Sequence, residues 1–272
     1  MPNFTTDALV LRVAPRGASD KLLTLISPGE GRFYAILKGG NSMKGREMAA
    51  TEPYTFSNFE FYEKNGFKWV KNATVNEAFG GVRYDSEKLF LAAYFADVVY
   101  ELSDEKTPAG EILPLCLNAM HMLSVTKGED ARIKAAFELR AAVIAGFAPA
   151  LDACAHCGSG ICDDMYLDVM NGALTCSACL SRQTALAPLP EIDETGARQI
   201  LVPLSPSAIA ALAFVAGAPA KRVFAFRLTD THTEELFARA AEVYLLHHLE
   251  RGFPTLENYK RLVAIRRQMI KS

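Results

Sequence analysis

The 272-residue sequence lacks the features of a membrane protein, a secreted scaffold or a polycation. No stretch of about 18 uncharged apolar residues occurs, so we expect no transmembrane helix. The first 13 residues lack the basic region, apolar core and cleavage site of a signal peptide. Six cysteines are too few and too unevenly placed for a disulfide framework, and a net charge of −2 argues against a histone-like polycation. We therefore expect a cytoplasmic protein.

Recognisable catalytic motifs are also absent. The sequence contains no Gly-x-Ser-x-Gly elbow, Walker loop, His-Glu-x-x-His helix or dinucleotide fingerprint. His247 and His248 are adjacent on a predicted helix and face different directions, which favours a core or interface role over metal binding. We predict that the chain is not an enzyme. Two alternatives stay open: a zinc-containing hydrolase or nuclease without a recognised motif, and a pure protein-interaction module.

The first 80 residues are typical of a small β domain. Five strand-like stretches cover residues 6–13, 21–27, 31–38, 55–62 and 68–75, separated by turns containing Gly, Pro or Asn. Five short strands with a longer connection between the third and the fourth predict an OB-fold barrel over residues 1–80. An SH3-like barrel is the alternative, because the pattern alone does not separate the two.

Beyond residue 85 the apolar residues recur at helical spacing. We predict helices over about 89–100, 112–123 and 131–147, and later helices capped by Ser205 and by Thr231 or Thr233. Cys116 lies on an apolar helical face and is expected to be buried. The predicted fold class is a multi-domain α+β chain. Its all-α helical domain occupies 81–149 and 186–272, and a cysteine-containing module is inserted at 150–185.

Two Cys-x-x-Cys units carry the strongest chemical signal in the sequence. Cys154–Cys157 and Cys176–Cys179 are separated by 18 residues, a spacing at which four thiolates converge on one tetrahedral Zn²⁺. Gly158 and Gly172 suit the tight turns of such a ribbon. Four thiolates leave no open coordination position, so we predict one structural Zn²⁺ per chain. The ion would staple a segment that is too small to hold a core by itself.

Other interpretations of the cysteines stay open. Iron in a rubredoxin-like site needs the same ligands, and a redox dithiol or fortuitously buried cysteines would show the same motif. His156 and Cys162 are close enough in sequence to be substitute ligands, although a solvent-facing histidine and a spare thiol are the simpler interpretations.

Alternation in two barrel strands predicts a cationic face. The residues expected to face the core are Leu9, Leu11 and Val13 of the first strand and Phe33, Ala35 and Leu37 of the third. Arg12 in the first strand, and Arg32, Tyr34 and Lys38 in the third, then project outwards. Cations beside an aromatic ring suit a single strand of nucleic acid, because charges contact phosphates and a ring stacks on bases. Residues 1–80 hold ten Lys and Arg against eight Asp and Glu, so an ordinary barrel surface is the alternative.

Several segments resemble the RecO family, bacterial recombination mediators of the RecFOR pathway. The segments that carry the resemblance are Ala8–Arg12, Ser19–Leu25, Gly31, Lys38–Gly39, Phe137–Arg140, Gly146–Pro149 and Leu151–Gly158. The barrel run Asp-Lys-Leu-Leu-Thr-Leu followed by Pro-x-Leu-Asp-x-Cys-x-x-Cys-Gly is specific only in combination. The resemblance covers essentially the whole chain.

The resemblance implies an OB fold, a helical domain and a zinc module inserted within it. It implies binding of single- and double-stranded DNA, annealing of complementary strands and help in loading RecA. The implied partners are RecR and the acidic, aromatic-ended tail of the single-stranded-DNA-binding protein. The expected location is the cytoplasm, in association with the nucleoid.

Residues are carried over from the family by position. Arg12, Lys21 and Lys38 match basic positions of the family's barrel, and Lys44 and Arg46 fall in its basic loop. The full predicted DNA-binding set is Arg12, Lys21, Arg32, Tyr34, Lys38, Lys44 and Arg46. The chain departs from the family at residues 40–43, where Gly-Asn-Ser-Met replaces a denser Arg/Lys cluster, and again at residues 252–256.

The partner tail needs an apolar pocket rimmed by cations. A candidate for this docking site is the predicted helix that carries Arg132, Lys134, Phe137 and Arg140. The alternative is that this segment is a plain amphipathic core helix.

Overall fold

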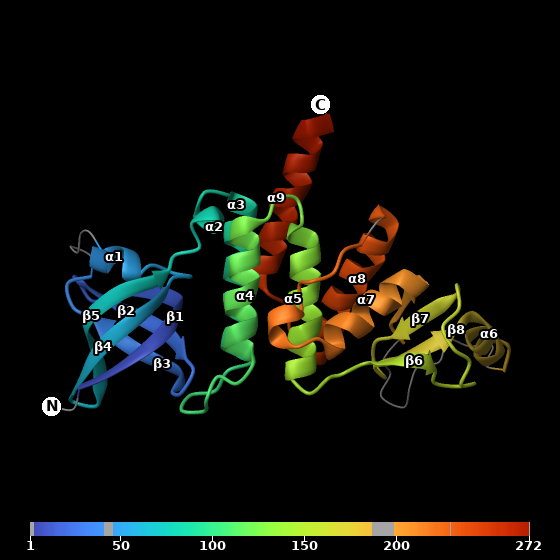
Figure 1. Ribbon diagram of the computed structural model, residues 1–272, viewed down its shortest axis with the longest axis horizontal. Helices are drawn as coiled ribbons and strands as arrows, with labels where there is room; N and C mark the ends of the chain where they lie inside the picture. Colours follow the sequence, from blue (N-terminus) through green and yellow to red (C-terminus); the bar gives the residue numbers. More distant parts are fainter. Residues whose placement is uncertain (1–2, 41–45, 187–198, 229, 272) are drawn as a thin grey trace. The chain divides into compact units, whose positions relative to one another are not determined.

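The computed structural model describes residues 3–40, 46–186, 199–228 and 230–271 (Figure 1). The chain divides into two compact units. Unit 1 consists of Met1–Lys127 and Phe253–Ser272, and unit 2 consists of Gly128–Gly252. The helices that the sequence assigns to one helical domain are therefore shared between the two units.

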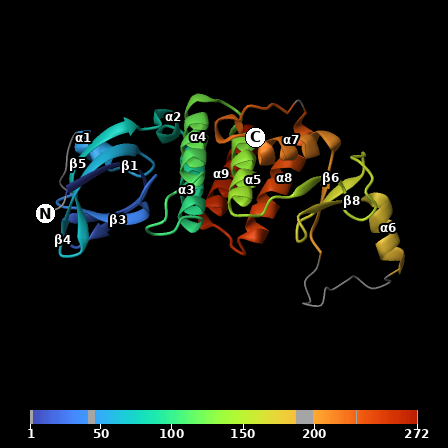
Figure 2. The same ribbon diagram turned by 60° about the horizontal axis from the view of Figure 1, so that its bottom comes forward.

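Five strands of unit 1 close into a barrel (Figures 1 and 2). They are β1 (Asn3–Arg16), β2 (Asp20–Ser27), β3 (Gly31–Leu37), β4 (Phe56–Lys64) and β5 (Phe67–Glu77). The strand order is β1-β2-β3-β5-β4, with β3 parallel to β5 and the barrel closed by antiparallel pairing of β1 with β4. This arrangement is OB-like and confirms the predicted barrel.

The predicted alternation of core residues is confirmed in β3 and is wrong in β1. Phe33, Ala35 and Leu37 belong to the apolar cluster inside the barrel. In β1 the interior residues are Ala8 and Val10, and Val13 packs against the same cluster. A β-bulge between Val10 and Arg12 inserts one residue into the alternation, which reverses the faces beyond it. Leu9 and Leu11 are still buried, on the outer side of the strand.

Unit 1 also contains helices. They are α1 (Arg46–Ala50), α2 (Gly80–Arg83), α3 (Ser86–Glu101), α4 (Ile112–Val125) and, from the end of the chain, α9 (Pro254–Lys271). The Asp85 side chain caps α3 by accepting hydrogen bonds from two backbone N–H groups of the first turn. α3 packs against β1, α4 and α9. Cys116 of α4 is fully buried, as predicted, and this burial raises the pKa of its thiol.

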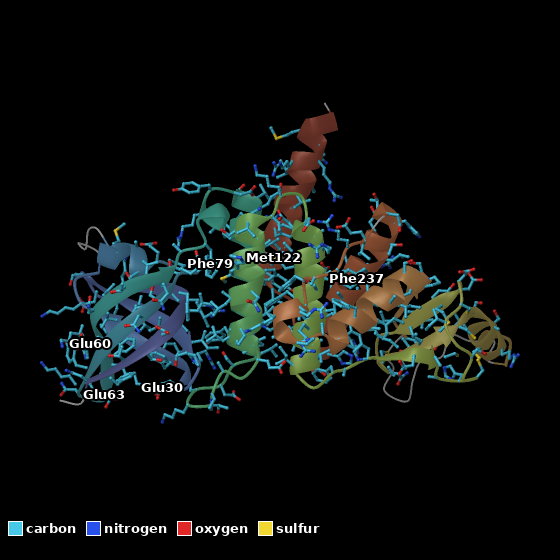
Figure 3. All side chains as sticks on the ribbon, in the orientation of Figure 1. Glu30, Glu60, Glu63, Phe79, Met122 and Phe237 are labelled. Atoms are coloured by element: carbon cyan, nitrogen blue, oxygen red, sulfur yellow. The ribbon has the colours of Figure 1, made fainter. Side chains whose placement is uncertain are left out.

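Unit 2 has a helical core and a small sheet. Its elements are α5 (Asp130–Ile144), β6 (Ala150–Cys154), β7 (Met165–Asp168), β8 (Ala173–Cys176), α6 (Ser177–Leu186), β9 (Leu201–Leu204), α7 (Pro206–Gly217), the short 3₁₀ helix Ala220–Arg222 and α8 (Thr231–His248). α5 packs against α7 and α8, and Phe237 of α8 lies in this core (Figure 3). The sheet order is β6-β8-β7-β9, so its last strand comes from beyond the predicted module.

The predicted caps and histidines of unit 2 have mixed outcomes. Ser205 caps α7 as predicted, because its hydroxyl accepts from the Ala208 N–H. Asp230, rather than either threonine, caps α8 by accepting from the Thr233 N–H. His248 stacks on the Phe147 ring, with centroids 4.6 Å apart, and burial lowers the pKa of the imidazole. Among the described helices, none is long and apolar enough to cross a membrane.

Gly31 is required by a close backbone approach within unit 1. Its φ is +63°, and a Cβ placed there would lie 1.9 Å from the Thr107 carbonyl oxygen. We expect Gly31→Ala to destabilise unit 1 by about 1–3 kcal/mol or more, because a left-handed alanine and a backbone clash coincide. Urea unfolding followed by circular dichroism measures this effect. Gly29→Ala, which meets nothing within 4 Å, is the matched control, and equal losses in both variants would contradict the prediction.

Candidate metal centre and nucleic-acid interface

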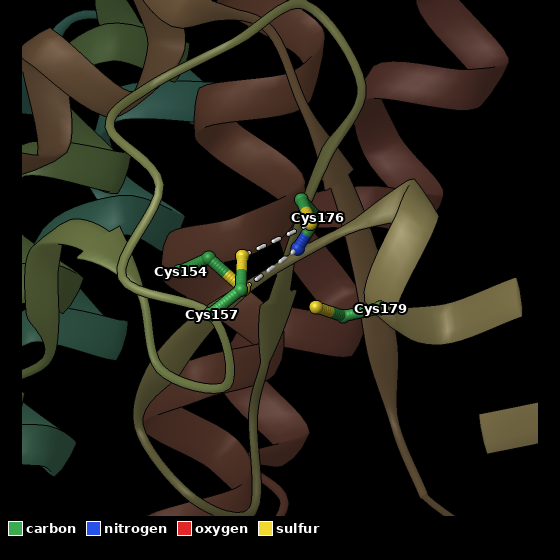
Figure 4. Close-up of side chains that lie close together, drawn as sticks. All are labelled: Cys154, Cys157, Cys176 and Cys179. Atoms are coloured by element: carbon green, nitrogen blue, oxygen red, sulfur yellow. Dashed lines mark hydrogen bonds between the residues drawn. The ribbon is translucent and has the colours of Figure 1, made fainter. Parts of the chain in front are cut away.

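Three elements of unit 2 bring the four predicted ligands together. Cys154 ends β6, Cys176 ends β8 and Cys179 lies in the first turn of α6. Cys157 lies in the turn after β6, where Gly158 has a φ of +72° and its N–H donates to the Cys154 carbonyl. The four side chains converge (Figure 4), and their sulfur atoms all lie within 4.8 Å of one another.

The donor set and its geometry fit a tetrahedral metal ion. The Sγ atoms of Cys157 and Cys176 are 3.8 Å apart. Four sulfurs at the ~2.3 Å bond length of zinc would be separated by about 3.8 Å. The backbone N–H of Cys176 points at Cys154 Sγ, 3.4 Å away, as outer-shell donors do around thiolate sites.

Three residues near the cluster, Ser159, His156 and Cys162, could be taken for further ligands or for partners of the sulfur atoms. The Ser159 hydroxyl lies 3.2 Å from Cys157 Sγ, and its hydrogen bond lowers the pKa of that thiol to about 6. His156 and Cys162 are both exposed and lie outside the four-sulfur cluster. The set that can hold a metal ion is therefore Cys154, Cys157, Cys176 and Cys179.

Strand pairing places the predicted cationic residues on one outer face of the barrel. Arg12 of β1 pairs with Thr24 of β2, which pairs with Tyr34 of β3, so these three form one row. Arg32 occupies the same face of β3 two residues before Tyr34. The bulge after Val10 is what turns Arg12 outwards. Its side chain is 44% exposed.

Helix α3 supplies partners for this face that the sequence did not predict. The guanidinium groups of Arg12 and Arg32 each lie 4.0 Å from the centroid of the Tyr100 ring. Arg12 Nη2 also donates to Asp97 Oδ1 at 2.6 Å. Part of the charge that was predicted to face solvent is therefore neutralised within unit 1.

The tyrosine pair at this position is polarised by its neighbours. The hydroxyls of Tyr34 and Tyr100 lie 3.3 Å apart. This hydrogen bond raises the pKa of Tyr34 and lowers that of Tyr100, and the nearby Arg32 and Arg12 lower the pKa of Tyr100 further. Tyr34 is 37% exposed, so one aromatic ring remains accessible on the face.

Two of the remaining predicted DNA contacts, Lys21 and Lys38, lie where the start of β2 pairs with the end of β3. Lys38 is exposed directly after β3, and Gly39 donates its N–H to Asp20 Oδ1 at 2.9 Å, which holds the loop to β2 and lowers the pKa of Asp20. Lys21 is half-buried on β2. Lys44 lies outside the described residues, and Arg46 is described only as the first residue of α1.

The four residues predicted to dock a partner tail do not form an exposed surface, and we correct that expectation. Phe137 has no exposed area, and Arg132 and Lys134 are 5% and 6% exposed. Arg132 donates to the carbonyls of Phe224 and Phe226, and Arg140 to that of Ala216. α5 is thus a core helix, as in the alternative interpretation, but its buried residues are not confined to one apolar face. The cations predicted to face a partner instead use internal acceptors: backbone carbonyls for Arg132 and Arg140, and the Glu138 and Glu242 carboxylates for Lys134.

Acidic residues of the barrel neutralise two of its lysines by ion pairing. Glu60 and Glu63 of β4 lie on the side of the barrel away from α3 and α4 (Figure 3). Glu60 pairs with Lys71, and Glu30 pairs with Lys68 at 3.0 Å. These two lysines are therefore neutralised locally, whereas Lys21 and Lys38 make no ion pair within the described residues.

Comparisons with known proteins agree on one family. The family described as "Recombination protein O N terminal" matches residues 1–79, and "Recombination protein O C terminal" matches residues 83–193. A "DNA repair protein RecO" of Acetivibrio thermocellus is 28% identical over 98% of this chain and 100% of its own length. One from Pelotomaculum thermopropionicum is 31% identical over 66% of this chain and 70% of its own length. A third, from Shouchella clausii, is 27% identical over 67% of this chain and 71% of its own length. On these matches, together with the OB-like barrel and the four converging cysteines, the chain belongs to the RecO family of DNA repair proteins.

Proposed function

We propose that this chain binds single- and double-stranded DNA through the outer face of its barrel and anneals complementary strands. In the same proposal it acts with RecR to help load RecA onto DNA coated by the single-stranded-DNA-binding protein. One observation carries the DNA-binding part: the row Arg12–Thr24–Tyr34, with Arg32 beside it and Lys38 beyond, combines cations and a ring on one surface.

The proposed activity needs no bond chemistry. Two complementary strands repel each other through their phosphates, and lysine and arginine side chains that neutralise those phosphates release condensed counterions. Contacts of this kind hold strands with little preference for sequence, which suits pairing of any two complements. In the free protein Arg12 is ion-paired with the Asp97 carboxylate. A DNA phosphate that binds Arg12 therefore has to compete with Asp97.

The Lys38→Ala variant tests whether the barrel face contacts DNA phosphates. Because removing one phosphate contact removes one released counterion, we expect Lys38→Ala to lower the slope of log affinity against log salt by about 0.7 for a single strand. Anisotropy of a labelled oligonucleotide between low and moderate salt measures the slope. A fluorescence-quench assay run in parallel should show slower annealing.

The matched control is Lys71→Ala on the same barrel. Lys71 is half-exposed but already ion-paired with Glu60, so its removal should leave the slope unchanged. Absence of oligonucleotide binding and annealing by the folded, metal-loaded protein at low salt would reject the proposed function.

We also propose that the four thiolates hold one structural Zn²⁺. The donor set is four sulfurs, and the 3.8 Å Cys157–Cys176 spacing supports a tetrahedral ion. When bound, such an ion supplies structural cross-linking of the knuckles and no open position for substrate. The ligands then join β6, β8 and the start of α6 within unit 2.

Membership of the family supports RecR and the acidic tail of the single-stranded-DNA-binding protein as partners. The burial of Phe137 argues that the tail does not dock on the α5 residues named from the sequence.

A further inference from the structure

A cluster of aromatic rings lies at the hairpin that joins β4 and β5. The two turn residues, Asn65 and Gly66, have φ of 53° and 76°, as a tight type I′ hairpin requires. Phe67 follows the turn and is 51% exposed. Tyr62 and Trp69 pair across the hairpin, with their rings stacked at 6.3 Å between centroids.

This cluster continues the outer face that carries Arg12 and Tyr34. Trp69 pairs with Ile36 across β5 and β3, and Ile36 lies two residues after Tyr34 on the same face. Arg16 likewise follows Arg12 by four residues in β1, so both project from the same side. The hairpin rings and the predicted cationic row therefore share one surface of the barrel.

The Arg16 guanidinium lies over two of the rings, and one of its N–H groups has no hydrogen-bond acceptor among the described residues. Its guanidinium carbon is 5.0 Å from the Phe67 centroid and 5.8 Å from that of Trp69. Arg16 Nη1 and Trp69 Nε1 are both buried and have no acceptor among the described residues. Buried donors without an acceptor are rare in folded proteins, and here two of them lie in one cluster, beside an exposed ring.

The charges around the cluster favour an anionic ligand. Lys64 is exposed directly before the hairpin turn, and Lys38 is exposed directly after β3, the strand that pairs with the start of β5. The opposing carboxylates are Asp20, which pairs in register with Arg16, and Glu63, which pairs with Lys68 and so points to the opposite face from Tyr62 and Trp69.

We propose that Phe67, Trp69 and Arg16 form a binding site for one unpaired nucleobase and its neighbouring phosphate. The base stacks on the exposed Phe67 ring, and the Arg16 guanidinium takes the phosphate as its acceptor. A base inside a duplex has both faces covered by its neighbours, so this site selects single-stranded over double-stranded polynucleotide. The inference rests on the proposed DNA binding and assigns its single-strand selectivity to residues outside the predicted set.

Trp69 provides a built-in reporter, because it is the only tryptophan in the chain. The full-length protein is titrated with an oligo(dT), with an abasic oligonucleotide of the same length and with a duplex. We expect oligo(dT) to change Trp69 fluorescence and the abasic strand to leave it nearly unchanged. We expect Phe67→Ala to weaken oligo(dT) binding about 5- to 150-fold, the equivalent of ~1–3 kcal/mol for one base stack, and to leave duplex and abasic binding unchanged.

Two further variants separate stacking from folding. Phe67→Tyr keeps a ring and should restore oligo(dT) affinity to within about twofold of the original. Tyr84→Ala removes another exposed ring of unit 1, 94% exposed, and should have no effect. Equal loss of abasic and oligo(dT) binding in Phe67→Ala would overturn the stacking site.

Anisotropy of an end-labelled oligonucleotide distinguishes this inference from the proposed function. Binding by anisotropy with silent Trp69 fluorescence and an unaffected Phe67→Ala variant would overturn the site and leave DNA binding in place. A fluorescence change produced by an acidic aromatic peptide instead of by oligo(dT) would overturn it in favour of a peptide ligand. Absence of any oligonucleotide binding at low salt would reject both.

Discussion

Replacing Cys154 by serine is expected to abolish the proposed metal binding and to unfold the small sheet of unit 2. Cys154 joins the end of β6 to the cluster. Its Sγ also accepts a hydrogen bond from the backbone N–H of Cys176 at the end of β8. Structural zinc in small modules contributes about 10–16 kcal/mol of apparent binding free energy, which is folding free energy because the unfolded ligands do not form a site. Elemental analysis should find one zinc per chain in the original protein and much less than one in the variant.

Cys162→Ser is the matched control for this prediction. Cys162 lies five residues after Cys157, is exposed and stands outside the cluster, so its replacement should keep one metal per chain. Hydrogen exchange should show loss of protection in β7 and β8 only in Cys154→Ser or after chelation. Equal metal loss in both variants, or a metal-free original protein prepared without chelator, would contradict the prediction.

Removing Lys134 is expected to produce the second large effect. Lys134 Nζ donates to both Glu138 and Glu242, at 2.8 and 2.7 Å, and Glu138 has no exposed area. Lys134→Met removes the Lys134 charge from the buried Glu138 carboxylate, because methionine fills the space but carries no charge. Breaking a buried pair in this way costs about 3–5 kcal/mol. Urea unfolding of the protein should show this loss in the transition of unit 2.

Two comparisons identify the cause of that loss. Lys71→Met, which removes the cation of the more exposed Lys71–Glu60 pair, should cost at most about 1 kcal/mol. Replacing Glu138 by leucine in the Lys134→Met background should recover part of the stability, since both charges of that pair are then gone. A cost under 1 kcal/mol for Lys134→Met alone would show that the pair does not stabilise α5.

The burial of α5 shows why local sequence does not place a charged helix. Its apolar and charged residues are spread around the whole helix, so no single face is apolar. Periodicity does not place such a helix, because its charges can face solvent or be paired inside the protein. The partners that decide between these options are distant in sequence, since Arg132 reaches the Phe226 carbonyl 94 positions away and Lys134 reaches Glu242 108 positions away. Local periodicity does not contain that information.

The barrel face shows a similar division. The alternation of Arg32 and Tyr34 with core residues in β3 was predictable, because a strand has a period of two. The bulge after Val10 was not, because an inserted residue leaves no distinct sign in a run such as Ala-Leu-Val-Leu-Arg. The aromatic cluster of Tyr62, Phe67 and Trp69 was also missed, although the Asn65-Gly66 turn between alternating residues could have placed its members across one hairpin.

The amino-acid sequence by itself determined the features that depend on near neighbours: the barrel strands, the Ser205 cap and the four-cysteine ligand set with its spacing. These follow from the periods of strands and helices and from the reach of one side chain across a short turn. The fold alone decided which charges face solvent. Arg12 meets Asp97 of α3, 85 positions away, and α5 lies inside unit 2, because burial and ion pairing depend on contacts that form only when distant segments pack together.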